Sequence, residues 1–197
     1  MSQLLQEDIE LFRPIFIENL KRFKDEQIIK ILCGVRRCGK STILKSYKNE
    51  LLSLGVKEQN IIERLYTSVE FDSDFDYRKM YHELMVLIEK ADKNQTVYLL
   101  LDEVQEVENW EKCVNSLFEN QNVDIYVTGS NSKLLSSEIS TYLTGRFVQI
   151  PIFTLSFAEF IDFKNYYFPK NSDNSLDYYF DLYLKTGGFP FLYSCNS

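Results

Sequence analysis

The sequence predicts an α/β fold in which a parallel β-sheet carries helices on both of its faces. Short apolar segments rich in β-forming residues alternate along the chain with segments whose apolar residues recur at helical spacing. One of the short segments, residues 96–101 (TVYLLL), is apolar on both faces, as a central strand of a parallel sheet is. Regular alternation of this kind is typical of parallel strands joined by helical crossovers.

The predicted elements follow one another in a regular order. Strands are predicted at residues 28–33, within 61–71, and at 96–101, 123–128 and 147–153. Helices are predicted at residues 7–23, 41–54, 77–90, 110–120 and 132–143, and the chain from residue 155 onward reads as helix, loop and helix. Pro14 is expected to interrupt the first helix near its start, because proline lacks the backbone N–H that a helix interior needs.

Composition and charge exclude several classes of protein. The chain has 197 residues and a formal net charge of −7, so broad contact with nucleic-acid phosphates is not indicated. Its four cysteines form no CxxC pair and its single histidine is His82, which excludes the usual zinc clusters. No stretch approaches the roughly 18 apolar residues of a membrane span, and the amino terminus lacks the features of a signal peptide. We therefore expect a cytoplasmic protein with reduced thiols and no membrane partner.

Residues 34–41 match the pattern G-x-x-x-x-G-K-[ST] of a phosphate-binding loop. The glycines let the backbone curl so that successive N–H groups point at phosphate oxygens, and the next helix directs its positive end at the same phosphates. The match stands between an apolar strand and a predicted helix, a context that a chance match in an ordinary turn would lack. The residues expected to contact the nucleotide are Gly34, Val35, Arg36, Arg37, Cys38, Gly39, Lys40, Ser41 and Thr42.

Several side chains of this loop have distinct expected roles. Lys40 can reach the β- and γ-phosphates of ATP, and the Ser41 hydroxyl can bind Mg²⁺. Arg36 and Arg37 can add positive charge near the phosphates, although we favour the interpretation that both face solvent.

Two adjacent carboxylates, Asp102 and Glu103, follow the apolar segment 97–101. Nucleotide sites form at the carboxyl ends of parallel strands. Asp102 is therefore predicted to hold Mg²⁺ together with Ser41, and Glu103 to polarise or deprotonate the attacking water. The alternative, that the pair only caps the next helix, is disfavoured by the phosphate loop upstream. Because one predicted strand separates the two motifs, their order is typical of the ATPase branch of P-loop proteins, not of the kinase and GTPase branch.

A polar sequence, Gly129-Ser130-Asn131, follows the strand predicted at 123–128. Asn131, with Ser130 as the second choice, is predicted to orient the attacking water or to contact the γ-phosphate. Capping of the next helix is an equally good interpretation. Guanine-specific enzymes carry an N-K-x-D motif, and the nearest string here, residues 131–134 (NSKL), lacks its acid, so adenine is favoured as the base.

Together these motifs resemble those of a family of bacterial and archaeal AAA+ ATPases. The resemblance is carried by GVRRCGKST at 34–42, LDEVQ at 101–105, Trp110-Glu111, TGSNSKLL at 128–135, LTGRF at 143–147 and GGFP at 187–190. It covers nearly the whole chain, and the combination is more specific than the phosphate loop alone.

The resemblance implies a three-layer P-loop fold of the ASCE type, with five parallel strands in the order 5-1-4-3-2. It implies an ATPase domain at residues 1–155, whose first helix lies within 1–25, and the beginning of a helical lid at 156–197. It also implies a nuclease-like C-terminal domain, which this chain would lack. Arg146 stands where AAA+ proteins often place an arginine finger, which implies a role in trans in a homo-oligomer. The alternative is a structural arginine that bonds the end of a strand or helix.

The favoured function is hydrolysis of Mg-ATP, with Lys40, Glu103, Asn131 and Arg146 as the candidate catalytic residues. The alternative is a slow nucleotide-gated switch, which would bind ATP tightly and present a surface to a partner protein. Both functions use the same pocket, and only turnover separates them. A small-molecule kinase would need an acceptor site and a cluster of lid arginines, and the sequence shows neither.

Overall fold

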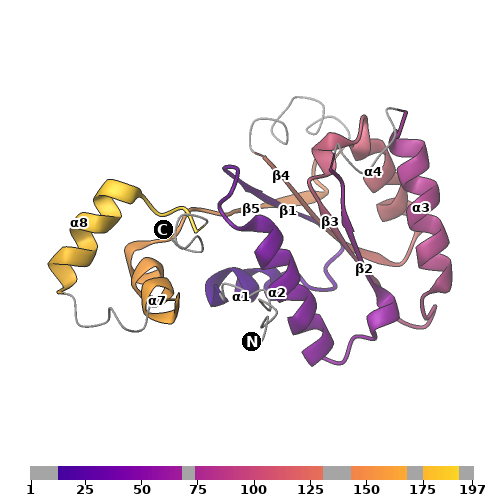
Figure 1. The fold of residues 1–197 in the computed structure, drawn as a ribbon. Coiled ribbons are helices and arrows are strands. Elements are labelled where there is room, and N and C mark those ends of the chain that lie inside the picture. Colours follow the sequence, from indigo (N-terminus) through magenta and orange to yellow (C-terminus); the bar gives the residue numbers. More distant parts are fainter. Residues whose placement is uncertain (1–12, 68–73, 131–142, 168–174, 191–197) are drawn as a thin grey trace, which may run out of the picture.

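A computed structural model of the protein describes residues 13–67, 74–130, 143–167 and 175–190. Strands and helices alternate along the chain, as predicted (Figure 1). In chain order the elements are α1 (Pro14–Arg22), β1 (Ile29–Gly34), α2 (Lys40–Ser53), the short 3-10 helix η1 (Glu58–Asn60), β2 (Ile61–Leu65), α3 (Tyr77–Lys90), β3 (Val97–Asp102), η2 (Val104–Glu106), α4 (Trp110–Asn120), β4 (Val123–Ser130), β5 (Phe147–Pro151), α7 (Phe157–Tyr167) and α8 (Leu176–Thr186).

The strands of the described residues form one parallel sheet in the order β2-β3-β4-β1-β5. This is the expected order 5-1-4-3-2 seen from the other edge, so the predicted fold class is confirmed. The register places Gly34 opposite Ser130 and Leu101 opposite Val127. The carboxyl ends of β1, β3 and β4 therefore meet at one edge of the sheet, where the motifs predicted from the sequence also lie.

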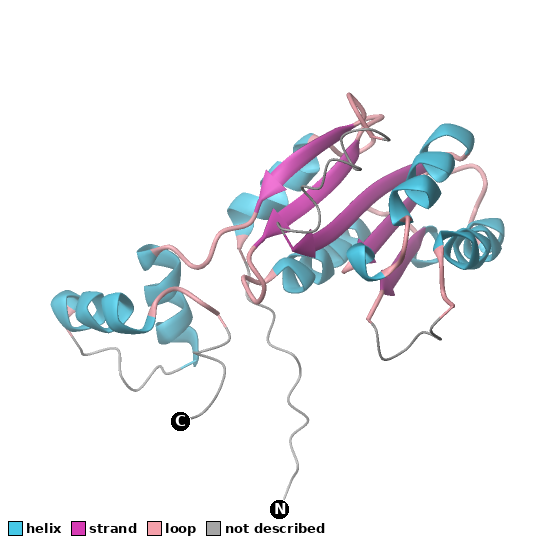
Figure 2. Cartoon of the chain, turned by 90° about the horizontal axis from the view of Figure 1, so that it is seen from above, coloured by secondary structure: helices cyan, strands magenta, loops and turns pink. Residues whose placement is uncertain are grey.

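Helices cover both faces of the sheet (Figure 2). Successive strand residues point to opposite faces. Accordingly, Leu99 and Leu101 of β3 pack in the hydrophobic cluster under α3 and α4, whereas Tyr98 and Leu100 pack in the cluster under α1 and α2. Every residue of β1 and β3 is buried, as the apolar character of these segments predicts.

The two C-terminal helices of the described residues lie to one side of the sheet (Figure 1). They share a separate hydrophobic cluster whose buried members are Leu155, Phe160, Phe163 and Tyr179. We call α7 and α8 the lid helices. The connection from β5 to α7, residues 152–156, joins the lid helices to the sheet.

Most observed bounds lie within one residue of the predicted ones, whereas those of α1, β4 and β5 differ by more; β5 ends at Pro151 and not at residue 153. α3 and α4 have the predicted bounds, whereas β4 extends to Ser130. The helix predicted at 7–23 is observed only from Pro14, because proline fits the first position of a helix, where its missing N–H costs nothing. Residues 1–12 and nearly all of the helix predicted at 132–143 lie outside the described residues.

Within the described residues, no helix is both long enough and apolar enough to cross a membrane. The cysteines in this part of the chain, Cys33, Cys38 and Cys113, are all buried free thiols. Trp110 packs in the core, and His82 lies exposed on α3.

Candidate functional site

The phosphate loop connects β1 to α2 in the predicted strand–loop–helix context. Gly39 occupies the N-cap position of α2 with a φ of 100°, in the left-handed region that glycine adopts readily. No side chain caps this helix, so its first backbone N–H groups remain available to a ligand. Val35, Arg36 and Arg37 are exposed, which agrees with the preferred interpretation of the two arginines.

Gly34 is needed because of close packing, not because of its backbone angles. A Cβ atom at this position would lie 2.3 Å from the Ile152 carbonyl oxygen and 2.8 Å from the Cys38 sulfur. The amide of Ile152 also donates a hydrogen bond of 2.7 Å to the Cys33 carbonyl. The start of the phosphate loop is therefore held tightly against the chain that leaves β5.

Lys40 is buried, with 4% of its surface exposed. Its ammonium nitrogen donates to the carbonyl oxygens of Gly34 and Val35, both at 3.2 Å. These long bonds hold the ammonium group over the same loop whose backbone would surround the phosphates. Of the other predicted contact residues, Ser41 is exposed and Thr42 is half-buried at the start of α2.

Asp102 ends β3 and is buried beside Ser41 and Thr128. Burial raises the pKa of its carboxyl group, while hydrogen bonds from the Ser41 and Thr128 hydroxyls act in the opposite direction. Thr128 also accepts a hydrogen bond of 3.1 Å from the Glu103 backbone N–H. The predicted Ser41–Asp102 pair is thus brought together, and Thr128 bridges it to Glu103.

Thr128 is a site residue that sequence reasoning missed. The expectation for this strand end was Asn131 or Ser130, but Asn131 and the Ser130 side chain lie outside the described residues. Thr128 could have been found from its type and register. It is a polar residue in the buried strand β4, and the pairing of Leu101 with Val127 places it beside Asp102.

Glu103 adopts a left-handed backbone conformation, with a φ of 55°. This conformation is uncommon for residues other than glycine and occurs most often where function requires it. The side chain is half-buried, and its carboxylate accepts a hydrogen bond from the Gln105 amide. The turn therefore directs Glu103 away from the line of β3 and into the region beside Asp102.

A small cavity of about 150 Å³ lies next to the Ser41–Asp102 pair. It is lined by Ser41, Leu44, Lys45, Glu63, Arg64, Leu65 and Asp102. Two of the charged side chains that line it are paired: Glu63 accepts from Lys48 at 3.0 Å and Arg64 donates to Glu83 at 2.6 Å. These pairs fix the carboxyl end of β2 next to the phosphate loop.

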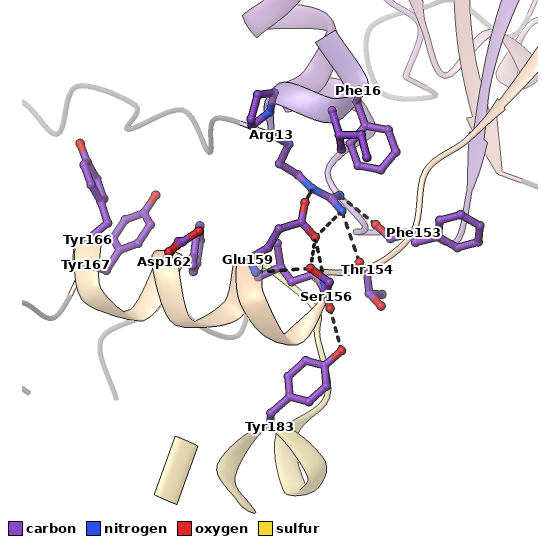
Figure 3. Close-up of a pocket in the computed structure, with 14 residues that line it drawn as sticks. Arg13, Phe16, Phe153, Thr154, Ser156, Glu159, Asp162, Tyr166, Tyr167 and Tyr183 are labelled. Atoms are coloured by element: carbon purple, nitrogen blue, oxygen red, sulfur yellow. Dashed lines mark hydrogen bonds and ion pairs between the residues drawn. The ribbon is translucent and has the colours of Figure 1, made fainter. Parts of the chain in front are cut away.

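A larger cavity of about 1000 Å³ opens between α1 and the lid helices (Figure 3). Its walls are mostly apolar and aromatic, and its polar members include Arg13, Ser156, Glu159 and Asp162. Arg13, one of the residues that line the cavity, also donates a hydrogen bond of 3.3 Å to the Cys38 carbonyl of the phosphate loop.

Arg146 lies at the amino end of β5, immediately before Phe147. Its guanidinium group donates to Asn115 at 2.6 Å and forms an ion pair with Glu119, both on α4. Because β5 runs parallel to β1, the amino end of β5 lies at the edge of the sheet opposite the phosphate loop. Within its own chain, Arg146 is thus separated from Lys40 and Asp102 by the length of a strand.

Comparisons with known proteins agree with this geometry. Residues 26–161 match a protein family described as an AAA domain. An uncharacterised protein of Haemophilus influenzae is 38% identical over 181 residues, which are 90% of this chain and 43% of that protein. An uncharacterised protein of Methanocaldococcus jannaschii is 31% identical in an alignment of 212 positions, which covers 96% of this chain and 44% of that protein. The chain therefore spans less than half the length of these curated relatives.

Two solved structures have a similar fold. AMPPCP-bound DnaA from Aquifex aeolicus has a TM-score of 0.55 at 17% identity, over 88% of this chain and 55% of DnaA. A DNA polymerase III gamma subunit-related protein from Thermotoga maritima has a TM-score of 0.53 at 12% identity, over 76% of this chain and 49% of that protein. At these identities the similarity establishes the fold alone.

Proposed function

This chain belongs to the AAA domain family, and from that premise we propose that it binds ATP together with Mg²⁺ and hydrolyses it. One observation carries the proposal. The phosphate loop after β1, Asp102 at the end of β3 and Thr128 near the end of β4 meet at the same edge of the sheet. In open α/β sheets, ligands bind at this carboxyl edge.

The phosphate loop would bind the triphosphate through its backbone and through Lys40. The uncapped N–H groups at the start of α2 supply donors, and the helix dipole favours the negative charge of the phosphates. Among the described residues, the Lys40 ammonium group donates two hydrogen bonds of 3.2 Å to carbonyls, which phosphate oxygens can replace with shorter, charge-assisted ones.

Ser41 and Asp102 would hold Mg²⁺. The fit rests on the chemistry of the donors, because a hydroxyl and a buried carboxylate offer the hard oxygen ligands that Mg²⁺ prefers. When bound, the ion supplies positive charge that neutralises the charge developing on the phosphate oxygens. Thr128 would orient the Asp102 carboxylate through their hydrogen bond.

Glu103 would act as the general base. Its backbone N–H is held by Thr128 at 3.1 Å, which fixes the turn beside the metal-binding pair. The carboxylate would accept a proton from the attacking water, or orient that water toward the γ-phosphate. Asn131 remains our proposal for the residue that contacts the γ-phosphate or the water.

The larger cavity would receive the nucleoside. Its wall includes Arg13, which binds the Cys38 carbonyl of the phosphate loop, and its apolar and aromatic side chains suit a flat heterocyclic base. Phe16, Tyr166 and Tyr167 are among the aromatic residues of its walls. We propose adenine as the base, since the sequence carries no guanine-reading motif.

Several proposals concern the wider protein. We propose that Arg146 acts in trans in a homo-oligomer and that the active protein works in the cytoplasm. The ATPase domain would occupy residues 1–155, and the lid would begin at residue 156. A nuclease-like C-terminal domain or a protein partner would complete the assembly.

A slow nucleotide-gated switch is the second candidate, and one observation favours it. The Gln105 amide donates a hydrogen bond to Oε2 of the Glu103 carboxylate, which occupies one of the two oxygen atoms that could accept a proton from water. If this hydrogen bond persists when ATP binds, hydrolysis is slow and the bound state lasts long enough to engage a partner.

Phosphate release from Mg-ATP tests the proposal. The wild type is expected to release phosphate, and Glu103→Gln to retain ATP binding while losing turnover by roughly 10²- to 10⁴-fold. Glu108→Gln is the matched control, because Glu108 is an exposed carboxylate five residues further along the chain. A wild type that binds ATP without turnover would favour the switch. Normal turnover by Glu103→Gln would exclude Glu103 as the base.

A further inference from the structure

Arg13 is a buried arginine immediately before α1, with 2% of its surface exposed. Its guanidinium group makes five hydrogen bonds, of which Figure 3 shows those to Glu159, Phe153 and Thr154. Two go to the Glu159 carboxylate, from Nε at 2.7 Å and from Nη2 at 3.1 Å. The other three go to backbone carbonyls: Phe153 at 2.8 Å, Cys38 at 3.3 Å and Thr154 at 3.3 Å.

These partners belong to three parts of the molecule that must cooperate around a nucleotide. Cys38 lies in the phosphate loop, Phe153 and Thr154 lie in the connection after β5, and Glu159 lies in the first turn of lid helix α7. Glu159 is held in turn by the backbone N–H and the hydroxyl of Ser156, at 2.8 and 2.9 Å. One planar, rigid donor therefore connects the phosphate loop to the lid.

The bond to Cys38 bears directly on the phosphate loop. In a planar trans peptide the C=O and the N–H point in opposite directions. When Arg13 holds the Cys38 carbonyl, it also directs the N–H of Gly39 away from the guanidinium group. This N–H belongs to the turn that would surround the phosphates, so a phosphate bound there fixes the same peptide group that Arg13 contacts.

We propose that Arg13 is a positioning residue that couples nucleotide occupancy of the phosphate loop to the orientation of the lid helices. The inference rests on the proposed function, because it requires that the loop binds ATP. ATP binding would fix the peptide between Cys38 and Gly39. Because Arg13 bonds both to this peptide and to Glu159, the orientation of α7 would then be restricted as well. Conversely, a lid fixed by Arg13 would hold the loop ready for phosphate.

A second set of contacts makes the coupling geometrically possible. The chain after α8 returns to the same connection, where the Leu155 N–H donates to the Gly188 carbonyl at 2.7 Å. The Tyr183 hydroxyl donates to the Leu155 carbonyl at 2.8 Å. A Cβ atom on Gly39 would lie 4.0 Å from the Pro190 ring, so this chain lies next to the phosphate loop. The segments that flank the lid helices, at residues 152–156 and 187–190, thus both lie next to the phosphate loop.

Lysine cannot replace Arg13 in this arrangement. The five bonds use three nitrogen atoms spread in one plane, and a lysine ammonium is a single point with three donors. Arg13→Lys keeps the positive charge but must release some of the partners. This substitution therefore tests the planar geometry of the guanidinium group separately from its positive charge.

The test measures ATP binding and lid protection in the same 197-residue chain. Mg-ATP affinity is determined by calorimetry, and amide hydrogen exchange of residues 157–167 is followed with and without Mg-ATP. The wild type is expected to bind ATP and to exchange more slowly in α7 when it is bound. Arg13→Lys is expected to bind ATP roughly 5- to 150-fold more weakly, the usual range of coupling between sites, and to lose the ATP-dependent protection of α7. Arg22→Lys, at an exposed position of the same helix, is expected to behave as the wild type.

The outcomes separate this inference from the proposed function. A wild type that binds no ATP overturns both. A folded Arg13→Lys protein with wild-type ATP affinity and undiminished protection of α7 overturns the coupling and leaves ATP binding intact. If Arg13→Lys does not fold, Glu159→Gln carries the test, because it keeps the volume of the side chain and removes the charge that Arg13 binds. Glu159→Gln is expected to lose the ATP-dependent protection of α7. If this variant folds and retains that protection, the inference is overturned.

Discussion

Lys30 and Asp124 form a buried ion pair at the amino ends of β1 and β4, away from the phosphate loop. Lys30 is fully buried and also donates to the Glu26 carbonyl at 2.9 Å. Asp124 accepts further hydrogen bonds of 2.9 Å from the Tyr126 hydroxyl and from the Asp25 backbone N–H. Burial lowers the pKa of Lys30 and raises the pKa of Asp124, so each charge depends on the other for its stability.

Lys30→Met is expected to lower the free energy of unfolding by roughly 3–5 kcal/mol, because it leaves the Asp124 charge buried without its partner. In this variant the raised folded-state pKa of Asp124 means that the folded protein binds more protons than the unfolded one. Its stability should therefore rise as the pH falls from 7 toward 5. Urea unfolding at several pH values measures both effects.

The double variant Lys30→Met/Asp124→Asn controls for the lost charge. It should be more stable than Lys30→Met at pH 7 and should lack the added pH dependence. Lys57→Met breaks the exposed Lys57–Asp92 pair and should lower the free energy of unfolding far less than Lys30→Met does, because solvent screens exposed charges. A Lys30→Met protein as stable as the wild type would show that the pair contributes little.

Individual site residues were predictable where their chemistry is tied to a motif. Lys40, Ser41 and Asp102 belong to strong patterns, and the structure brings them to one edge of the sheet. Arg13 was not predictable, because the partners of its guanidinium group are 25 to 146 residues away in the chain and three of them are backbone carbonyls. Sequence spacing carries no signal for such contacts.

At the scale of elements, the apolar pattern predicted the strands and helices well, whereas capping chemistry decided their ends. α3 begins where Asp76 accepts hydrogen bonds from the Arg78 and Lys79 backbone N–H groups. Likewise, α2 begins at Lys40 because Gly39 supplies the left-handed residue before it. β4 extends beyond its apolar run to Ser130 because it pairs with β1 as far as Gly34. That extension is a tertiary effect, which local patterns do not report.

The position of the lid helices could not be predicted from sequence patterns. Their existence was predicted, but their place beside α1 depends on the Arg13–Glu159 pair and on the bond between Leu155 and Gly188. Gly188 is required there by close approach, since a Cβ atom would lie 2.3 Å from the Leu155 carbonyl oxygen. The GGFP sequence at residues 187–190 could be recognised in the sequence, but its contact with the connection after β5 could not be predicted from it.

At the scale of the whole molecule, the arrangement of the sheet separates Arg146 from the phosphate loop of its own chain. Arg146→Ala is expected to lower turnover at protein concentrations that permit assembly by roughly 10³-fold or more, while ATP affinity stays near that of the wild type. Phosphate release across a range of protein concentrations provides the measurement.

The ion pair of Arg146 with Glu119 supplies the control for this prediction. Glu119→Gln removes the ion pair and keeps the arginine, so it should leave turnover near the wild-type value. If Glu119→Gln lowers turnover as much as Arg146→Ala does, the arginine serves its own chain by bonding α4. Turnover per chain that is unchanged in Arg146→Ala at every concentration would also exclude the role in trans.

The central claim is that the loop at residues 34–42 binds ATP through Lys40, since both candidate functions require it. Calorimetric titration of Mg-ATP into the wild type and Lys40→Met tests this claim most directly, with the exposed Lys93→Met as the control. The account predicts saturable binding by the wild type and by Lys93→Met. It also predicts that Lys40→Met binds at least about tenfold more weakly, because charge-assisted hydrogen bonds to phosphate are lost. Absence of binding by the wild type, or equal binding by all three proteins, would contradict it.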